Sequence, residues 1–426
     1  MNVLEAARPL RLGRVTELVG LHLRVRGLHA AVGDLVEVEP GVLAEVAASD
    51  PDGLVCLPLG ETTGLRVGAL ARHTGGPLRV HVGDALRGRI LDGLGRPVDG
   101  GPSLDHLPLV PVQHPAPAAL SRPRIAEQLG TGVRVLDTLV PVGRGQRIGV
   151  MAGSGVGKSS LLSMVARGTD AEVSVIALVG ERGREVREFL EDDLGPEGLS
   201  RSVVVVATSD APPVERLRAA FVATRIAEHF RDTGKHVVLM MDSLTRVAMA
   251  QREIGLSAGE PPATRGYPPS VFALLPRLLE RAGTAAGGSI TGIYTVLVEG
   301  DDLQDPVGDT ARSILDGHVV LSRRLATAGH FPSIDVLESI SRVTGAVTTP
   351  AQRRSATDLR RLLAAHRDVR ELVEIGAYVP GADADADRAI ALLPQLDAFL
   401  RQDLHETVRL VDAWSALADL VDEDAA

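Results

Sequence analysis

A glycine-rich run with a single lysine carries the clearest chemical signal in the 426-residue chain. Residues 152–159 read Ala-Gly-Ser-Gly-Val-Gly-Lys-Ser and depart from the phosphate-binding pattern G-x-x-x-x-G-K-[ST] only at Ala152, which replaces the first glycine. The glycines let backbone N–H groups turn toward phosphate oxygens, and the helix that follows presents its positive end. Lys158 would reach the β- and γ-phosphates, and the Ser159 hydroxyl would bind Mg²⁺. We therefore predict a nucleoside triphosphate site that includes Gly153, Ser154, Gly155, Val156, Gly157, Lys158, Ser159 and Ser160.

Two carboxylates stand directly after apolar runs that read as buried strands. Asp242 follows residues 237–241, and Glu181 follows residues 173–180. Ligands of a parallel sheet lie beyond the carboxyl ends of its strands, so both side chains are expected near the phosphates. We predict that Asp242 holds the metal through water and that Glu181 orients and deprotonates an attacking water. Taken singly, either residue would as readily be a helix N-cap or a loop charge.

Other charged residues are weaker candidates for the same site. Asp301 and Asp302 end the apolar run 290–298 and are expected near metal-bound water. An arginine could stabilise the charge that spreads over the γ-phosphate during its transfer. The chain has 43 arginines and two lysines, so most arginines must be surface residues. Arg182, next to the Glu181 carboxylate, and Arg342 are the two candidates, although spacing alone does not select Arg342.

The elements that must position these residues divide the chain into four predicted parts. Up to residue 96, short alternating runs punctuated by glycine predict a small N-terminal β-barrel. Residues 97–123 hold at least seven prolines and predict an extended connector. From 124 to 348, strands that are apolar throughout alternate with helical stretches, which is typical of a parallel α/β sheet covered on both faces. Residues 349–426 show no strand pattern and predict a helical domain.

Individual strands and helices follow from the same patterns. The predicted barrel strands are residues 21–25, 35–38, 53–59 and 78–82. The predicted sheet strands are residues 147–151, 173–179, 202–207, 237–241 and 290–298. In the last part, residues 356–373 and 388–400 carry apolar side chains at three- and four-residue spacing and predict helices.

Composition excludes several classes of protein. With 45% hydrophobic and 23% charged residues the chain reads as a soluble globular protein, and no apolar run reaches the roughly 18 residues that cross a bilayer. Glu5 and Arg8 interrupt the start, so a signal peptide is not expected. Cys56 stands alone, which rules out an internal disulfide and fits a reducing cytoplasm. A net charge of −10 and 2% aromatic residues argue against a nucleic-acid channel.

Several motifs, in this order along the chain, resemble the rotary-type ATPases. They are residues 152–159, Gly180 to Glu185, Met241 to Arg246, Gly266 to Ser270 and Ser339 to Arg342. Residues 253–262 (EIGLSAGEPP), 271–283 (VFALLPRLLERAG) and 313–323 (SILDGHVVLSR) look like the bacterial flagellar protein-export ATPases and their injectisome relatives. The resemblance covers nearly the whole chain.

The resemblance implies a barrel, a RecA-like P-loop NTPase core and a C-terminal helical domain, assembled as a homohexamer with sites between neighbours. Since Glu181 and Arg342 occur in one chain, identical subunits could supply base and finger at every interface. Phe331 matches the aromatic residue that stacks on adenine in this family, or it is a plain core residue. The implied roles are triphosphate and Mg²⁺ binding for Lys158 and Ser159, water activation for Glu181, γ-phosphate contact for Arg182, a metal role for Asp242, an arginine finger in the adjacent subunit for Arg342, and a place at the pocket edge for Tyr267.

The function that this resemblance implies is Mg²⁺-dependent ATP hydrolysis that energises export of flagellar proteins through a type III secretion apparatus. The implied partners are stator and central-stalk proteins, the export gate at the membrane, export substrates and chaperones, with no nucleic acid. The protein would be cytoplasmic and peripherally associated with the export apparatus at the inner membrane. Residues 375–387 fall where related subunits touch the central stalk, or they form a solvated loop. The stretch before Gly13 is short for a stator-binding extension, which puts that contact in doubt or makes it smaller.

Three other functions stay open at this point. An injectisome ATPase would share every catalytic residue, and only the neighbouring genes would separate it from the flagellar system. A nucleic-acid motor such as the transcription termination factor also uses a RecA-like ring, but the acidic charge opposes it. A nonhydrolytic nucleotide-binding scaffold would lack phosphate release.

Overall fold

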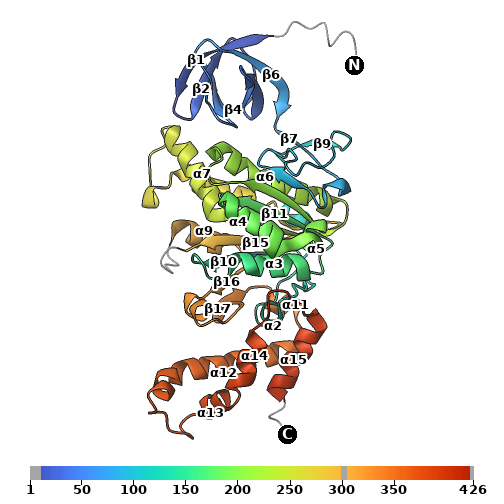
Figure 1. The fold of residues 1–426 in the computed structure, drawn as a ribbon, viewed down its shortest axis with the longest axis vertical. Helices are drawn as coiled ribbons and strands as arrows, with labels where there is room; N and C mark the ends of the chain where they lie inside the picture. Colours follow the sequence, from blue (N-terminus) through green and yellow to red (C-terminus); the bar gives the residue numbers. More distant parts are fainter. Residues whose placement is uncertain (1–10, 299–304, 423–426) are drawn as a thin grey trace.

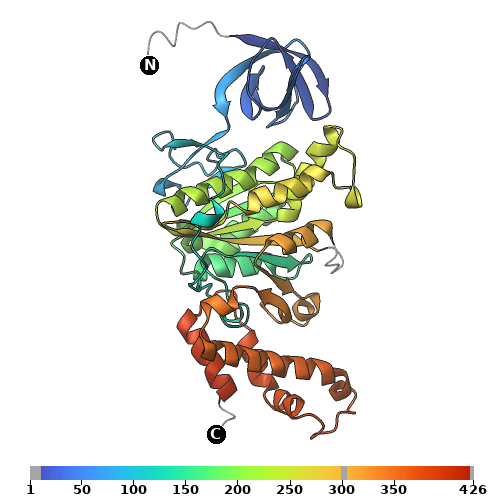
Figure 2. The same ribbon diagram turned by 180° about the vertical axis from the view of Figure 1, so that it is seen from behind.

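The computed structural model describes residues 11–298 and 305–422, in three parts stacked along the long axis (Figures 1 and 2). The N-terminal part is a closed six-stranded antiparallel barrel in the order β1-β2-β5-β4-β3-β6. Its interior is apolar because alternate strand residues, such as Val15, Leu23 and Val36, point inward. The barrel strands are β1 (Leu12–Val19), β2 (His22–Arg26), β3 (Asp34–Val38), β4 (Val42–Asp50), β5 (Gly53–Pro58) and β6 (Leu70–Pro77).

The predicted strand 78–82 does not belong to the barrel. Its residues form β7 (Arg79–His81), which pairs with β9 (Leu109–Pro111) inside the proline-rich stretch. A further short strand, β8 (Ile90–Asp92), joins the edge of the central sheet beside β12. Val80 and Leu91 are buried in the cluster that packs under α6, so burial against the core, and not alternation, decides where these strands lie. The four domain limits given above remain predictions.

The central part is a nine-stranded sheet in the order β17-β16-β10-β15-β13-β11-β12-β8, with β14 paired to β15. All its pairings are parallel except those of β14 and β17. The five predicted sheet strands are all present, within one residue at each end. The bounds are β10 (Arg147–Ala152), β11 (Val173–Val179), β12 (Ser202–Ala207), β13 (His236–Asp242), β14 (Gly283–Thr284), β15 (Ser289–Leu297), β16 (Gly317–Leu321) and β17 (Ile334–Ser341).

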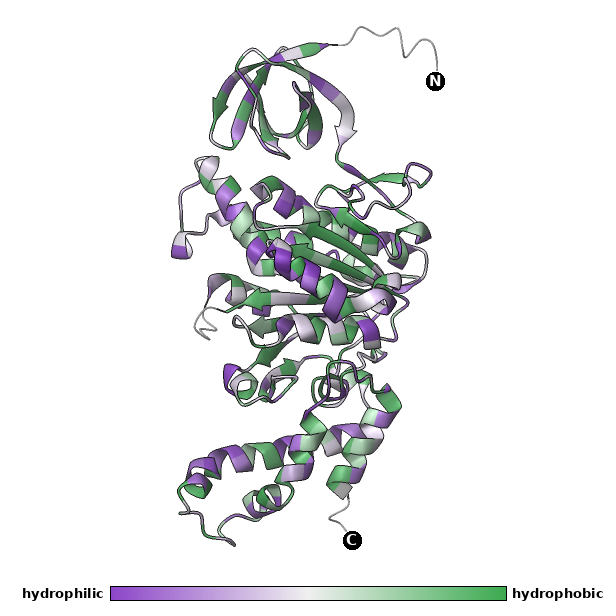
Figure 3. Ribbon diagram, viewed as in Figure 1, coloured by the Kyte–Doolittle hydropathy of each residue, from purple (hydrophilic) through white to green (hydrophobic). Residues whose placement is uncertain are grey.

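Helices cover both faces of this sheet, as predicted. Along β11, Val175 and Ala177 pack in one apolar cluster and Ile176 and Leu178 in the other. Figure 3 shows the same strands coloured as hydrophobic between helices with polar outer faces. One face carries α6 (Pro213–Asp232), α7 (Leu244–Ser257), α8 (Pro269–Leu279) and α9 (Pro306–Ile314), and the other carries α3 (Lys158–Gly168), α4 (Gly183–Glu188), the π-helix η3 (Phe189–Leu194) and α5 (Gly195–Ser200).

Short helical segments fill the connections. They are the 3₁₀ turns η1 (Asp84–Leu86), η2 (Ala119–Ser121) and η4 (Thr264–Gly266) and the helices α2 (Arg134–Leu139), α10 (Arg323–Thr327) and α11 (Thr344–Val347). The connector itself is held to the core, because Arg122 donates to the Ala282 carbonyl at 3.2 Å and to the Glu280 carbonyl at 2.6 Å. The barrel is held by an ion pair between Glu45 of β4 and Arg218 of α6.

The C-terminal part is helical, as predicted. Its long helix α12 (Pro350–Glu374) begins at a capping box, in which Thr349 accepts from the Gln352 N–H and the Gln352 side chain accepts from the Thr349 N–H. The predicted helix 388–400 is broken into α13 (Ala384–Ala391) and α14 (Leu393–Leu400), where Pro394 stands at the start of the second helix. The last helix is α15 (Leu410–Asp422). Within residues 11–298 and 305–422, no helix has the length and apolar character to cross a membrane.

Candidate nucleotide site

The glycine-rich loop joins the carboxyl end of β10 to the first turn of α3, the strand–loop–helix setting that the motif requires. Gly155 and Gly157 have φ of 72° and 89°, a region that residues with a Cβ rarely adopt. Ala152 is the last, fully buried residue of β10 and has no positive φ, so alanine is compatible with the first position of the motif. The loop therefore keeps its cradle shape despite the missing glycine.

Lys158 lies between the two predicted carboxylates. Its Nζ is 3.1 Å from Glu181 Oε1 and 2.6 Å from Asp242 Oδ1. The exposed fraction is 12% for the Lys158 side chain, 15% for that of Glu181 and 4% for that of Asp242. Burial acts to lower the Lys158 pKa, but the two carboxylates outweigh it and leave that pKa above its ordinary value. The ammonium is thus charged and is the counter-ion of both acids.

Sheet register brings these residues together. β11 and β13 are parallel neighbours, with Leu178 paired to Asp242, so Glu181 and Asp242 emerge at one edge. Gly180, with φ of 74°, turns the chain after β11 against the Arg246 side chain, where a Cβ would approach within 2.9 Å. The sequence prediction that both acids meet the loop at the carboxyl edge is therefore matched by their positions, while their catalytic roles stay predictions.

Three residues that sequence reasoning missed hold the site in shape. Thr295 of β15 donates its Oγ1–H to Asp242 Oδ1 at 2.7 Å. Ser333 donates to the Val156 carbonyl at 2.5 Å, and Arg323 donates to the Ser154 carbonyl at 3.2 Å. A threonine inside the apolar run 290–298 was a usable signal for the first. The contacts of Ser333 and Arg323 join residues more than 160 positions apart, so no local sequence pattern could have predicted them.

Phe331 lies against the loop. A Cβ on Gly157 would be 3.3 Å from Cδ1 and Cε1 of the Phe331 ring, and the ring is 45% exposed. Phe331 is therefore half open to solvent beside the loop, and its role in stacking on adenine stays a prediction. Tyr267 is different: it is buried, with its ring edge-on to Phe272 and under the Arg252 guanidinium. Its predicted place at the pocket edge remains a prediction.

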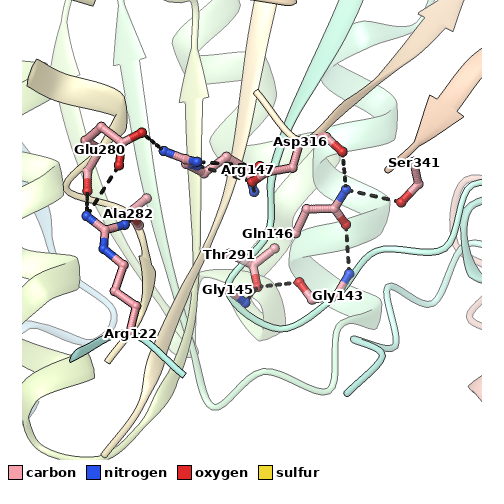
Figure 4. A network of polar contacts seen from close by, with 10 residues as sticks. All are labelled: Arg122, Gly143, Gly145, Gln146, Arg147, Glu280, Ala282, Thr291, Asp316 and Ser341. Carbon is pink, nitrogen blue, oxygen red and sulfur yellow. Dashed lines mark hydrogen bonds and ion pairs between the residues drawn. The ribbon is translucent and has the colours of Figure 1, made fainter. Parts of the chain in front are cut away.

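The two candidate arginines have partners other than the acids that hold Lys158. The Arg182 side chain is 81% exposed and pairs with Glu185 at 3.6 Å. Arg342 is exposed and follows Ser341, whose hydroxyl accepts a bond from Gln146 immediately before β10 (Figure 4). Asp301 and Asp302 lie outside the described residues.

Arg342 and the loop are at opposite ends of β10. The Arg342 backbone N–H donates to the Asp316 carbonyl. The Asp316 carboxylate in turn accepts from the backbone N–H of Arg147, the first residue of β10, at 3.0 Å (Figure 4). The six residues of β10 span roughly 20 Å, whereas the loop begins only after Ala152. Arg342 therefore lies away from the loop of its own subunit, where its Nη2 donates to the Arg312 carbonyl at 3.3 Å, and its role as a finger stays a prediction.

The donor set fits Mg²⁺ bound together with a triphosphate. No group of three or more His, Cys, Asp and Glu that would enclose a metal exists among residues 11–298 and 305–422. Mg²⁺ is usually held by one or two protein oxygens, substrate phosphates and water, and such a site needs no enclosing cluster. Ser159 at the start of α3 and Asp242 at the end of β13 are the oxygens available here.

These features define a P-loop nucleoside triphosphatase built on a parallel sheet. Residues 132–341 match the family model of the ATP synthase alpha/beta family, nucleotide-binding domain, and residues 348–419 match the T3SS EscN ATPase C-terminal domain. The chain is 50% identical to the flagellum-specific ATP synthase of Bacillus subtilis (strain 168), over 96% of this chain and 95% of that protein. It is 49% identical to the type 3 secretion system ATPase of Xanthomonas euvesicatoria, over 97% and 95%.

A solved structure agrees along the full length. The assembled ATPase EscN from the enteropathogenic E. coli type III secretion system, in complex with its central stalk EscO, superposes with a TM-score of 0.90 at 45% identity, covering 96% of this chain and all of that one. The protein belongs to the family of flagellum-specific ATP synthases and type 3 secretion system ATPases, and it is a nucleotide-binding ATPase.

Replacing Lys158 by alanine should weaken ATP binding by about tenfold to a hundredfold, the loss expected for charge-assisted bonds to phosphate. It should also lower the midpoint of thermal unfolding, because the buried Glu181 and Asp242 side chains lose the cation that stabilises them. Calorimetric titration with ATP and a thermal scan measure the two effects. The matched control is Lys235→Ala, the other lysine, which pairs with the exposed Asp84. Equal ATP affinity in both variants would contradict this account of the loop.

Proposed function

We propose that the protein is a Mg²⁺-dependent ATP hydrolase that energises the export of flagellar proteins through a type III secretion apparatus. The observation that carries the hydrolytic part is the buried placement of Lys158 between Glu181 and Asp242 at the carboxyl edge of the sheet. The flagellar part rests on the names of relatives that match over nearly the whole chain, such as the flagellum-specific ATP synthase of Salmonella typhimurium at 50% identity.

In this proposal the loop and its lysine bind the triphosphate. Ser159 and Asp242 would hold Mg²⁺, which supplies charge neutralisation for the transferred phosphoryl group. Glu181 then accepts the proton of the water that attacks the γ-phosphate, and Lys158 stabilises the phosphate oxygens. Arg182 reaches the γ-phosphate only after its ion pair with Glu185 breaks. This costs little, because an exposed ion pair contributes about 0–1 kcal/mol.

We infer that the active form is a ring of six identical subunits. Arg342 lies at the far end of β10 from the loop, so its guanidinium can serve as a finger only in a neighbour's site. Exposed Ile340 lies two residues before it on the edge strand β17, which gives this face an apolar contact for a second copy. Each site would then combine Lys158 and Glu181 of one subunit with Arg342 of the next.

The helical domain is the proposed contact for a central stalk. EscN, the structural relative, is assembled in complex with its central stalk EscO. In this chain the end of α12 and the following loop expose Leu372, Val373, Ile375 and Val379. Apolar side chains grouped at one exposed tip favour a protein contact over a plain solvated loop. Stator proteins, the export gate, export substrates and chaperones are the other proposed partners, with the ring in the cytoplasm at the inner membrane.

An injectisome ATPase is the second candidate. The observation in its favour is the 49% identity to the Xanthomonas euvesicatoria type 3 secretion system ATPase, close to the value for the flagellar relatives. Every site residue discussed above would serve both systems. The genes beside this one separate the two.

Replacing Glu181 by glutamine should leave ATP binding nearly intact and lower kcat by about a hundredfold to ten-thousandfold, because the amide keeps the size of the side chain and cannot take a proton. Phosphate release and ATP titration measure the two quantities. Glu185→Gln is the control, since this carboxylate lies on the exposed side of α4. Unchanged hydrolysis in Glu181→Gln would remove the assigned base.

Arg342→Ala should abolish hydrolysis without weakening ATP binding to the subunit that carries the change. Mixing it with Lys158→Ala subunits should restore part of the activity, since these provide an intact Arg342 to sites that still have Lys158. The control partner is the double variant Lys158→Ala/Arg342→Ala, which provides no Arg342 to a neighbouring site. If no mixing ratio restores activity, the finger does not act between subunits.

A further inference from the structure

Gln402, in the segment between α14 and α15, is only 5% exposed, and its backbone N–H and both polar atoms of its side chain are hydrogen-bonded. Its backbone N–H donates to the Phe331 carbonyl at 3.0 Å. Its side-chain Oε1 accepts from the Arg134 N–H at 2.8 Å, and its Nε2 donates to the carbonyls of Gly132 at 2.7 Å and Glu406 at 2.9 Å. A buried amide with both donors and its acceptor satisfied is fixed in one orientation.

The groups that Gln402 joins lie at the two ends of the loop helix α3. Phe331 packs on Gly157, the residue before the helix begins. Gly132 packs on Gly168, the residue that ends it, so closely that a Cβ on Gly132 would come within 2.6 Å of the Gly168 Cα. The contacts form a closed path from the loop along α3 to Gly132, through Gln402, and back by Phe331 to the loop.

The helical domain enters this path chiefly through the segment around Gln402. Arg134 supports the same segment, with its guanidinium donating to the carbonyls of Ala398, Phe399 and Arg401. On the other side, His330 Nδ1 lies 3.0 Å from Asp397 Oδ1, directly before Phe331. A shift of α14 would therefore move the backbone that carries the Phe331 ring.

We propose that Gln402 is a positioning residue that sets the place of Phe331 over the nucleotide and couples it to the C-terminal helices. The inference rests on the proposed function, because it takes Phe331 as the platform for adenine. Gln402 does not touch the phosphates, so it acts on affinity for the base and not on the chemical step. The side chain fixes the segment around Gln402, and the backbone N–H of that segment holds the Phe331 carbonyl, so motion of the helical domain changes nucleotide affinity through this segment.

Arg360 offers a matched control within the same domain. It anchors α12 to the core by donating to the carbonyls of Val336 at 2.8 Å, Leu139 at 2.7 Å and Ser339 at 3.2 Å. None of these bonds involves Phe331 or Gly132. Loss of domain anchoring in general would thus appear in an Arg360 variant, whereas loss of the platform would appear only in a Gln402 variant.

The test compares Gln402→Glu, Phe331→Leu, their double variant and Arg360→Lys in the full-length protein. Glutamate keeps the acceptor for the Arg134 N–H and turns a carboxylate oxygen toward the carbonyls of Gly132 and Glu406. We expect KM for ATP and Kd for ADP to rise about threefold to tenfold, as for one or two lost hydrogen bonds, with kcat within about twofold. Affinity for inorganic tripolyphosphate, which has no base, should stay at the wild-type value.

Two comparisons decide between the inference and a merely structural role. In the Phe331→Leu background, Gln402→Glu should add nothing further to KM, since both changes act on one platform. Arg360→Lys should leave both KM and the tripolyphosphate affinity unchanged. Gln402→Met removes both donated bonds and also the bond accepted from the Arg134 N–H, adds no charge, and should repeat the KM effect if the glutamate variant does not fold.

Additive effects of Gln402→Glu and Phe331→Leu, or an equal loss of tripolyphosphate affinity, would overturn the inference. If Phe331→Leu alone leaves KM unchanged, the adenine role in the proposed function fails first. A raised KM in Phe331→Leu with wild-type kinetics in both Gln402 variants would refute the coupling and leave the proposed function standing.

Discussion

One ammonium lies between two buried carboxylates, and the remaining features of the site depend on that arrangement. Lys158 is held by Glu181 and Asp242 at 3.1 and 2.6 Å. Two acids this close and this buried would repel each other more strongly without it, so the lysine stabilises their placement beside the loop. A triphosphate with its metal brings its own charges, and the lysine then has competing partners. Binding and release of nucleotide therefore involve a redistribution of the same three charges.

The strand directions of the sheet determine which candidate site residues lie together in one subunit and which lie apart. Parallel strands place the loop, Glu181 and Asp242 at one edge, because each follows the carboxyl end of its strand. The antiparallel edge strand β17 runs the other way and delivers Arg342 to the opposite edge. A single subunit consequently holds the phosphate loop, Glu181 and Asp242 at one edge of the sheet and Arg342 at the other. The finger role that the resemblance implies for Arg342 would therefore need a neighbouring subunit.

Much of the site could be predicted because its residues lie in short, recognisable stretches of the sequence. The loop is eight consecutive residues, and the two acids follow apolar runs that end at the same sheet edge. Ser333, Arg323 and Gln402 were missed because their partners are distant in sequence and the contacts follow no periodicity, whereas Thr295 was marked by its place inside an apolar run. The fold was predicted to a similar extent. Alternation identified residues 78–82 as a strand but could not say that Val80 packs under α6 and not in the barrel.

A structure of the protein with Mg²⁺ and a nonhydrolysable ATP analogue tests the exchange of charges most directly. The account predicts that Lys158 Nζ gives up its 2.6 Å contact with Asp242 for oxygens of the β- and γ-phosphates, while the Glu181 carboxylate faces the γ-phosphate across a water. A complex in which Lys158 still bridges both acids, with the triphosphate bound away from residues 153–160, would contradict it.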